Sequence, residues 1–241
     1  MNAPAAKVQL LRLDQALSRF GFCGRREAAY WIKDGRVTVK GQVVRSADER
    51  ADPADLLVDG QTVDFPRGLL VMFHKPVGLV CSHEAREGER IYDRLPERWM
   101  RRNPQPATVG RLDKDTSGLV FITDSGDLIH RWTSPKHEVE KEYEATLDAD
   151  LPPGAVQAMA ASTLMLKDEG KKDHDKPCKP AKLDVLAPRR ARLTLTEGRY
   201  HQVRRMFAAL GCTVLTLHRL RMGEHTLADL AEGEWKAVEM P

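Results

Sequence analysis

The sequence has few cysteines, no long apolar run and no large excess of either charge. Its four cysteines lie far apart and none forms a C-x-x-C pair, which favours reduced thiols over a disulfide or zinc framework. The N-terminal residues lack the apolar core of a secretory signal, and no apolar run approaches the length of a membrane span. These absences predict an unprocessed cytoplasmic protein that has no contact with a membrane.

Charge is distributed unevenly along the chain. The formal net charge of +3 is too small to indicate a polyanionic partner by itself. Residues 19–45, however, hold seven lysines and arginines against two acids, whereas residues 48–64 are acidic. The positive charge of this region is therefore local to the first part of the chain.

Residues 59–68 form the clearest boundary in the sequence. The charge-rich first part ends there, and the segment precedes an apolar run at 69–73, which predicts a linker. A second irregular segment, 170–182, is rich in lysine and proline and is expected to be a mobile loop. A chain of 241 residues is long enough for a small domain followed by a larger one.

The first part of the chain predicts two short helices and a hairpin. Apolar residues recur at helical spacing from Leu10 to Phe20, glycines interrupt the pattern, and a second helical stretch runs from Arg25 to Lys33. The segments 37–39 and 42–44 flank a Lys-Gly pair and are typical of a tight hairpin.

The second helix carries a cluster of basic residues. Three basic side chains can share one side of it, namely Arg25, Arg26 and Lys33. We expect the apolar side chains to pack inward, namely Ala28, Ala29 and Ile32. Such an array suits phosphates, but a solvated helix face explains the same pattern.

The order of these elements resembles the small RNA-binding module first named from ribosomal protein S-four. The resemblance rests on L-R-L-D-Q-A-L, R-R-E-A and I-K-D-G-R-V-T-V-K-G, and covers roughly residues 10–58. Members of that family usually carry a serine that caps the second helix, whereas this chain has Cys23-Gly24, so we expect a weaker cap. The resemblance implies RNA binding through Arg25, Arg26, Lys33 and Arg36.

A glycine-bounded decapeptide, Gly110-Arg-Leu-Asp-Lys-Asp-Thr-Ser-Gly-Leu119, is where we expect the chemistry. It predicts a turn between two β segments, at 108–109 and 119–123, and Asp113 is its central candidate. Its acidic spacing also imitates a calcium loop. That alternative is rejected because an EF-hand needs flanking helices and a final glutamate, whereas this chain has Asp124 at that position.

Three further segments accompany the decapeptide. Lys75, which follows an apolar strand, could contact a phosphate or cap the strand. In the alternating segment 139–147, Lys141, Tyr143, Ala145 and Leu147 share one face; Tyr143 then points inward, either as core or as a surface for stacking a base. The segment 193–207 sets four basic side chains against the single acid Glu197, namely Arg199, His201, Arg204 and Arg205. That patch is extended by Arg192 and by Arg219 or Arg221.

Together, H-K-P-x-G, G-R-L-D-x-D-T-S-G-L, K-x-Y and E-G-R-Y-H-Q-V-R-R-M-F resemble the ordered motifs of bacterial ribosomal-RNA pseudouridine synthases. The match covers nearly the whole chain and is similar to the small-subunit branch of that family. It implies an α+β protein, with a small α/β RNA-binding domain at 10–58, a linker at 59–68 and a catalytic domain at 69–241. The catalytic domain is expected to contain a mixed, largely antiparallel sheet flanked by helices.

The resemblance also implies roles for individual residues. Asp113 matches the catalytic aspartate, Tyr143 the tyrosine that stacks on the target base, and Arg204 the basic residue that pairs with the catalytic carboxylate. A nearby guanidinium would keep that carboxylate ionised at neutral pH. Arg111 is expected to hold the flipped nucleotide, and Leu195 to line the pocket. Whether Asp113 acts as a nucleophile or as a base is left open.

The expected reaction detaches a uracil, rotates it and rejoins it to the ribose, so it needs no cofactor and no metal. The expected substrate is 16S ribosomal RNA or a small-subunit assembly particle, bound by a monomer. Two alternatives remain: a synthase acting on 23S ribosomal RNA, and a non-catalytic RNA-binding or ribosome assembly protein of the same fold.

Overall fold

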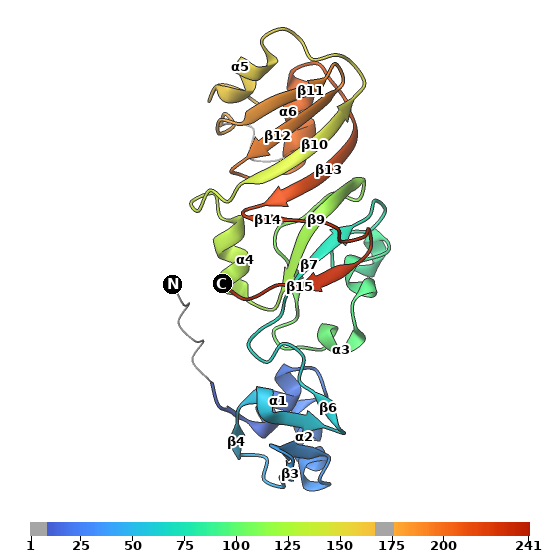
Figure 1. The fold of residues 1–241 in the computed structure, drawn as a ribbon, viewed down its shortest axis with the longest axis vertical. Coiled ribbons are helices and arrows are strands. Elements are labelled where there is room, and N and C mark those ends of the chain that lie inside the picture. The colour runs from blue at the N-terminus through green and yellow to red at the C-terminus, as the bar shows by residue number, and fades with distance from the viewer. Residues whose placement is uncertain (1–8, 167–175) are drawn as a thin grey trace.

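The computed structural model describes residues 9–166 and 176–241, so positions 170–175 of the expected loop lie outside the described residues. The chain forms an elongated molecule in which a small N-terminal module lies at one end of a large sheet (Figure 1). The helices are α1 Leu13–Arg19, α2 Arg25–Lys33, α3 Glu97–Met100, α4 Gly126–Thr133, α5 Ala155–Ala160 and α6 Gln202–Ala209, with short 3-10 turns at Pro53–Asp55, Ala85–Glu87 and Ile91–Arg94.

The strands of the N-terminal module are β1 Leu11–Arg12, β2 Val37–Val39, β3 Gln42–Val43, β4 Arg50–Ala51, β5 Leu56–Val58 and β6 Gln61–Thr62. Those of the large sheet are β7 Leu70–Lys75, β8 Ala107–Thr108, β9 Thr116–Thr123, β10 Lys141–Leu147, β11 Lys182–Ala187, β12 Arg190–Leu195, β13 Val214–Met222, β14 His225–Thr226 and β15 Trp235–Ala237. None of the helices in the described ranges is long and apolar enough to span a membrane.

The N-terminal module contains the predicted helices and hairpin around its own apolar core. Helix α2 begins where Glu27 accepts a hydrogen bond from the backbone N–H of Gly24 at 2.9 Å, so a glutamate compensates for the missing serine cap. The prediction for Ala29 was wrong, because its side chain is exposed while Ala28 and Ile32 are buried. Strand β6 pairs with β5, so part of the segment expected to be a linker belongs to this module's sheet.

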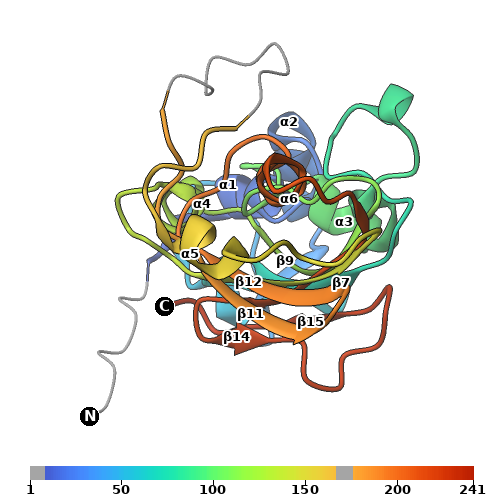
Figure 2. The same cartoon turned by 90° about the horizontal axis from the view of Figure 1, so that it is seen from above.

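The large sheet is mixed and largely antiparallel. Its strand order is β11-β12-β10-β13-β9-β7-β15, with β8 and β14 paired to β9 and β13, and only the β9–β13 pair is parallel. In the view of Figure 2, helices α2, α3 and α6 lie on the same side of this sheet. The predicted α+β architecture is therefore confirmed.

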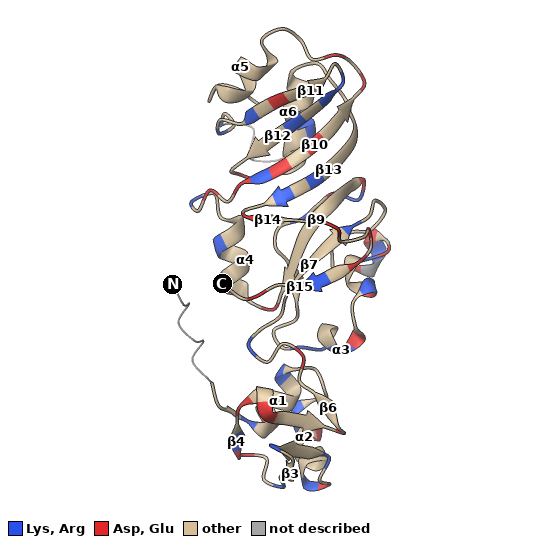
Figure 3. Cartoon of the chain, in the orientation of Figure 1, with Lys and Arg blue, Asp and Glu red and all other residues tan. Residues whose placement is uncertain are grey.

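Strands β7 and β9 are apolar on both faces because the sheet separates two cores. Val71 and Phe73 belong to the larger core, whereas Leu70 and Met72 belong to the smaller one on the opposite face. Strand β10 instead alternates, and its buried residues are Lys141, Tyr143, Ala145 and Leu147, as predicted. Opposite them, Glu142 and Glu144 pair with arginines of β12 and β13, and Figure 3 shows this alternation of charge along the strands.

The predicted turn at 110–119 ends earlier than expected, because Thr116 to Leu119 already belong to β9. Gly118 lies against the backbone of Arg219 in the parallel strand β13. A Cβ atom at Gly118 would lie 2.3 Å from the Arg219 carbonyl oxygen and 2.5 Å from its nitrogen. This glycine is therefore required for close approach of two strands rather than for a turn.

Arg102 joins the N-terminal module to the sheet. Arg102 is almost fully buried, pairs with Asp124 at 2.7 Å, and donates to the carbonyl oxygens of Asp64 and Phe65. Its guanidinium also lies over the Phe20 ring, 4.8 Å from the ring centroid. The same side chain thus contacts the module, the segment that follows it and the end of β9.

Candidate active site

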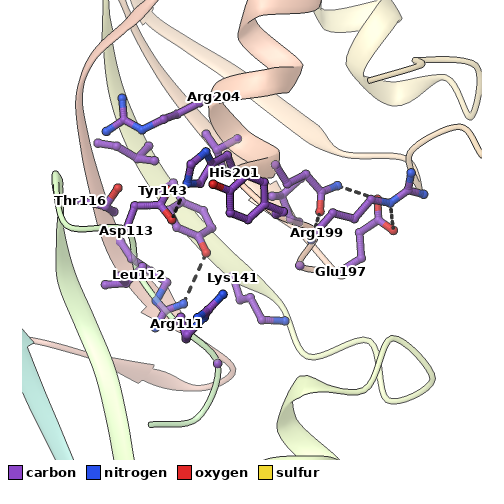
Figure 4. Close-up of a pocket in the computed structure, with 18 of the residues that line it drawn as sticks. Arg111, Leu112, Asp113, Thr116, Lys141, Tyr143, Glu197, Arg199, His201 and Arg204 are labelled. Carbon is purple, nitrogen blue, oxygen red and sulfur yellow. Dashed lines mark hydrogen bonds and ion pairs between the residues drawn. The ribbon is translucent and has the colours of Figure 1, made fainter. Parts of the chain in front are cut away.

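A cavity of about 330 Å³ opens where the loop before β9, strands β10, β12 and β13, and the start of α6 meet. Figure 4 shows Asp113, Tyr143 and His201 projecting toward it, with Arg204 at its edge. Residues far apart in the sequence therefore form one wall around the decapeptide. Of the sequence-predicted residues, the cavity is lined by Arg111, Asp113, Tyr143, Leu195, Arg199, His201, Arg204 and Arg219.

Asp113 is the only carboxylate of the decapeptide that lines the cavity. Burial raises the pKa of its carboxyl group above the ordinary value, and the negative charge of Asp115 acts in the same direction. His201 opposes this effect, since its Nε2 lies 3.4 Å from the carboxylate Oδ1 of Asp113. Burial therefore outweighs the nearby basic groups in setting the direction of this pKa shift.

Of the two alternatives for Lys75, direct contact with a phosphate does not fit its position. Its side chain has no exposed surface. The ammonium group donates to the backbone carbonyl oxygens of Asp113 at 3.1 Å and Thr116 at 2.8 Å, and also to that of Pro76. Lys75 therefore holds the loop that presents Asp113, and burial lowers the pKa of its ammonium group.

Arg204 does not make the predicted ion pair with Asp113. Its Nη2 lies 2.8 Å from the Asp115 carboxylate, and its Nη1 donates to the carbonyl oxygen of Val214. This contact joins α6 to the exposed Asp115 of the decapeptide, so Arg204 lies near Asp113 without pairing with it. Arg204 still lowers the pKa of Asp113 through its charge.

Tyr143 and Leu195 face the cavity from adjacent antiparallel strands, β10 and β12. Behind Tyr143 lies Arg219 of β13, whose Nη1 donates to the tyrosine hydroxyl at 3.4 Å. The structure separates the two candidates that extended the basic patch: Arg219 lines the cavity, whereas Arg221 pairs with Glu140 away from it.

Lys141 is a pocket residue that lies on the predicted face of its strand but was not among the predicted site residues. It is nearly buried, lines the cavity and donates to the carbonyl oxygen of Val139 at 2.9 Å. Burial, reinforced by the charge of Arg219, lowers the pKa of its ammonium group to about 8. Its position two residues before Tyr143 on one strand face was the signal that could have identified it.

The turn before α6 is held by a polar network around Glu197. The carboxylate accepts from Gln202 at 2.6 Å and from Arg199 at 3.3 Å, while Arg199 also donates to the carbonyl oxygens of Lys176 and Pro177. The prediction that Arg205 contacts RNA was wrong, because this side chain is buried and donates to the carbonyl oxygen of Tyr200.

His201 has an unusual backbone conformation at the start of α6. Its φ of 47° lies in the left-handed region, which side chains other than glycine rarely adopt. The ring stacks on Tyr200, with 3.7 Å between the ring centroids. Backbone strain of this kind persists where the surrounding structure holds it, often at functional sites, and here it places His201 beside Asp113.

The basic residues predicted on the N-terminal module lie on or next to α2. Arg25, Arg26 and Lys33 are exposed. Arg36 follows the helix, stacks over the Trp31 ring at 3.5 Å and pairs with Asp59. The three helix side chains thus remain accessible to a phosphate, while Arg25 also pairs with Asp14 at 3.6 Å and Arg36 also has the contacts with Trp31 and Asp59.

No three His, Cys, Asp or Glu side chains come together as a metal site would require in the ranges 9–166 and 176–241. The cavity instead combines a partly buried carboxylate, an aromatic ring and several basic groups. Such a set can hold a polar planar ring and act on it through Asp113.

Comparison with known families divides the chain in the same order. The model described as RNA pseudouridylate synthase matches residues 69–209, and the S4 domain model matches residues 11–57. The first match contains the whole decapeptide, Tyr143 and the start of α6.

Individual proteins are similar over nearly the full length. The ribosomal small subunit pseudouridine synthase A of Yersinia pestis is 41% identical over 238 residues, which cover 95% of this chain and 94% of the relative. The protein of the same name from Escherichia coli K12 is 39% identical and covers 95% of this chain and 96% of the relative. A crystal structure of a pseudouridylate synthase is similar with a TM-score of 0.63 and 36% identity, covering 95% of this chain and 96% of that one.

Proposed function

Because this chain belongs to the RNA pseudouridylate synthase family, we propose that it converts one uridine of 16S ribosomal RNA to pseudouridine, with Asp113 as the catalytic carboxylate. The observation that carries the proposal is the cavity at Asp113, walled by Tyr143 and Leu195. A carboxylate, a stacking ring and an apolar wall suit a single extruded base.

The reaction is an isomerisation whose atoms balance without a second reactant. The bond between ribose C1′ and uracil N1 breaks, the base rotates within the cavity, and a bond forms between C1′ and C5. The proton lost from C5 is balanced by the proton gained at N1. Asp113 starts this sequence at the ribose or at the base, and the cavity retains the detached uracil, so no cofactor is required.

Extrusion of the uridine from the RNA costs a few kcal/mol, which new contacts must offset. Stacking on the Tyr143 ring supplies one contact, and Arg111 at the exposed rim supplies charge for the flipped nucleotide or its phosphate. The basic face of α2 supports docking of the surrounding RNA, since α2 and α6 lie on the same side of the large sheet (Figure 2).

The relatives that are similar over the whole chain are named small-subunit synthases, which favours 16S over 23S ribosomal RNA as the substrate. We place the activity in the cytoplasm, on 16S ribosomal RNA or a small-subunit assembly particle, and carried out by a monomer. The catalytic constellation of Asp113 and Tyr143 supports an enzyme over a non-catalytic RNA-binding protein.

The proposal is tested by incubating purified protein with unmodified 16S ribosomal RNA, small-subunit assembly particles and 23S ribosomal RNA. Pseudouridine is then mapped at nucleotide resolution. We expect one site in 16S ribosomal RNA, lost in Asp113→Asn with RNA affinity retained. Asp115→Asn is the matched control and should keep most of the activity, because Asp115 pairs with Arg204 outside the cavity. Product only in 23S ribosomal RNA would contradict the substrate, and no product at all would contradict the enzyme.

A further inference from the structure

Arg219 is a buried cation that the proposed reaction has not yet used. It lies in the cavity wall with 2% of its surface exposed, and its Nε donates to the carbonyl oxygen of Leu119 at 2.6 Å. Among the residues that the structure describes, no carboxylate pairs with it, and its Nη2 has no hydrogen-bond partner. A buried guanidinium without a counter-ion is unfavourable for stability, so its place beside the cavity calls for a functional explanation.

The contact between Arg219 and Tyr143 has a defined direction. A guanidinium has only donors, so in the 3.4 Å contact the hydroxyl oxygen of Tyr143 accepts from Nη1. The hydroxyl hydrogen of Tyr143 must then point elsewhere, and no acceptor for it lies within the described part of the chain. Tyr143 lines the cavity, so this hydrogen is left for an acceptor that enters with a ligand.

The backbone fixes this arrangement on both sides of the contact. Tyr143 and Arg219 are directly paired in the register of β10 and β13. On its other side, Arg219 is paired with Gly118, whose missing side chain allows the two strands to approach closely. The guanidinium therefore reaches Tyr143 from a rigid position, as preorganised polar groups do in catalytic sites.

We propose that Arg219 is a positioning residue for the reaction, which turns the Tyr143 hydroxyl so that it donates to an oxygen atom of the bound uridine. This inference rests on the proposed function. The acceptor is an oxygen of the uracil or of the ribose, and the two sources share the same chemistry. Tyr143 thus contributes a directed donor in addition to its ring.

A double-mutant cycle tests whether Arg219 acts through the hydroxyl. Single-turnover rates are measured with a 16S ribosomal RNA fragment for wild type, Tyr143→Phe, Arg219→Met and the double variant. We expect each single change to slow the reaction about tenfold, and Arg219→Met to have less than about a twofold effect once the hydroxyl is absent. Arg221→Met, two residues further along β13 and outside the cavity, is the matched control and should react as wild type.

Several outcomes overturn the inference. If Tyr143→Phe reacts as fast as wild type, the hydroxyl has no role. If the double variant is slowed by the product of the two single effects, Arg219 does not act through the hydroxyl. Thermal melting separates these outcomes from loss of fold. If Arg219→Met does not fold, Arg219→Lys takes its place in the cycle. With Tyr143 present, this variant should keep part of the wild-type rate. Equal slowing by Arg219→Lys with and without the Tyr143 hydroxyl contradicts the inference.

Modified substrates identify the acceptor. Fragments with 2-thiouridine, 4-thiouridine or 2′-deoxyuridine at the target replace or remove one oxygen each. The wild-type rate should fall with one of these fragments. The rate of Tyr143→Phe with that same fragment should equal its rate with the unmodified fragment. If wild type makes no pseudouridine in the unmodified fragment, the proposed function is contradicted. If wild type is active but every modified fragment slows Tyr143→Phe as much as it slows wild type, only the inference on Arg219 is contradicted.

Discussion

Burial of the Asp113 carboxyl group links catalysis to stability. Its pKa is raised in the folded protein, so the folded state holds its proton more tightly than the unfolded chain does. Stability is therefore lost as the pH rises from the ordinary carboxyl range through the raised pKa. The residue proposed for the chemistry destabilises the fold at neutral pH, where it is needed as a carboxylate.

We predict that Asp113→Asn melts at a higher temperature than wild type at pH 7. The gain should shrink toward zero below about pH 4, where an ordinary carboxyl group is protonated in both states. Thermal melting at a series of pH values measures it. Asp115→Asn serves as the control and should give no such gain, because its carboxylate is exposed and paired with Arg204; a destabilised Asp113→Asn at pH 7 would refute the assignment.

Lys75→Met distinguishes loop support from phosphate binding. Removing the ammonium group leaves the Asp113 and Thr116 carbonyl oxygens without their donor, which should destabilise the protein by about 1–3 kcal/mol. A displaced Asp113 should lower the single-turnover rate by roughly 10–100-fold. Affinity for RNA and its salt dependence should stay as in wild type. A shallower salt dependence would instead support the phosphate contact that the sequence left open for Lys75.

The sequence identified the type of site residue better than its contacts. Arg204 and Arg205 were predicted together as basic groups, yet successive residues on a helix point in different directions. Arg204 therefore reaches the decapeptide while Arg205 turns into the interior. The sequence left the role of Lys75 open because its acceptors are backbone carbonyls that come close only after the strands pair.

At the scale of elements, local patterns predicted some of the helices and strands but not their neighbours. The alternation in β10 and the Lys-Gly pair of the first hairpin are short-range signals, and both predictions were confirmed. The parallel pairing of β9 with β13 joins segments about a hundred residues apart. No local pattern encodes it, so Gly118 was interpreted as part of a turn.

Gly118→Ala tests that pairing. The added Cβ would overlap the Arg219 backbone, and φ is +113° in a region that side chains disfavour, so we expect destabilisation of more than about 3 kcal/mol with loss of activity. Urea unfolding measures the change. Gly126→Ala is the matched control, since its Cβ would meet nothing within 4 Å, and it should change stability by less than about 1 kcal/mol. Equal effects of the two substitutions would contradict the requirement for close strand approach.

At the scale of the whole molecule, α2 lies on the same side of the large sheet as α6 (Figure 2), and the first turn of α6 lines the cavity. We predict that reversing charge with Arg25→Glu and Arg26→Glu weakens RNA binding and reduces the slope of log affinity against log salt by about 1 for each lost phosphate contact. The single-turnover rate at saturating RNA should be unchanged.

Arg190→Glu is the control for this reversal, because Arg190 pairs with Glu144 on the opposite face of the sheet. It changes the net charge as one substitution on α2 does, but should leave the salt slope unaltered. Equal weakening by the control would show that overall charge, rather than the α2 surface, determines RNA affinity.

The position of Arg219 in β13 also sets an order of events during synthesis. The N-terminal module is complete once residue 63 is made, whereas the cavity lacks its last wall until β13 has emerged from the ribosome. Because domains fold as units and distant strand pairs form slowly, the nascent chain gains its RNA-binding module well before it gains a working cavity. A chain arrested between these two points would occupy RNA without modifying it.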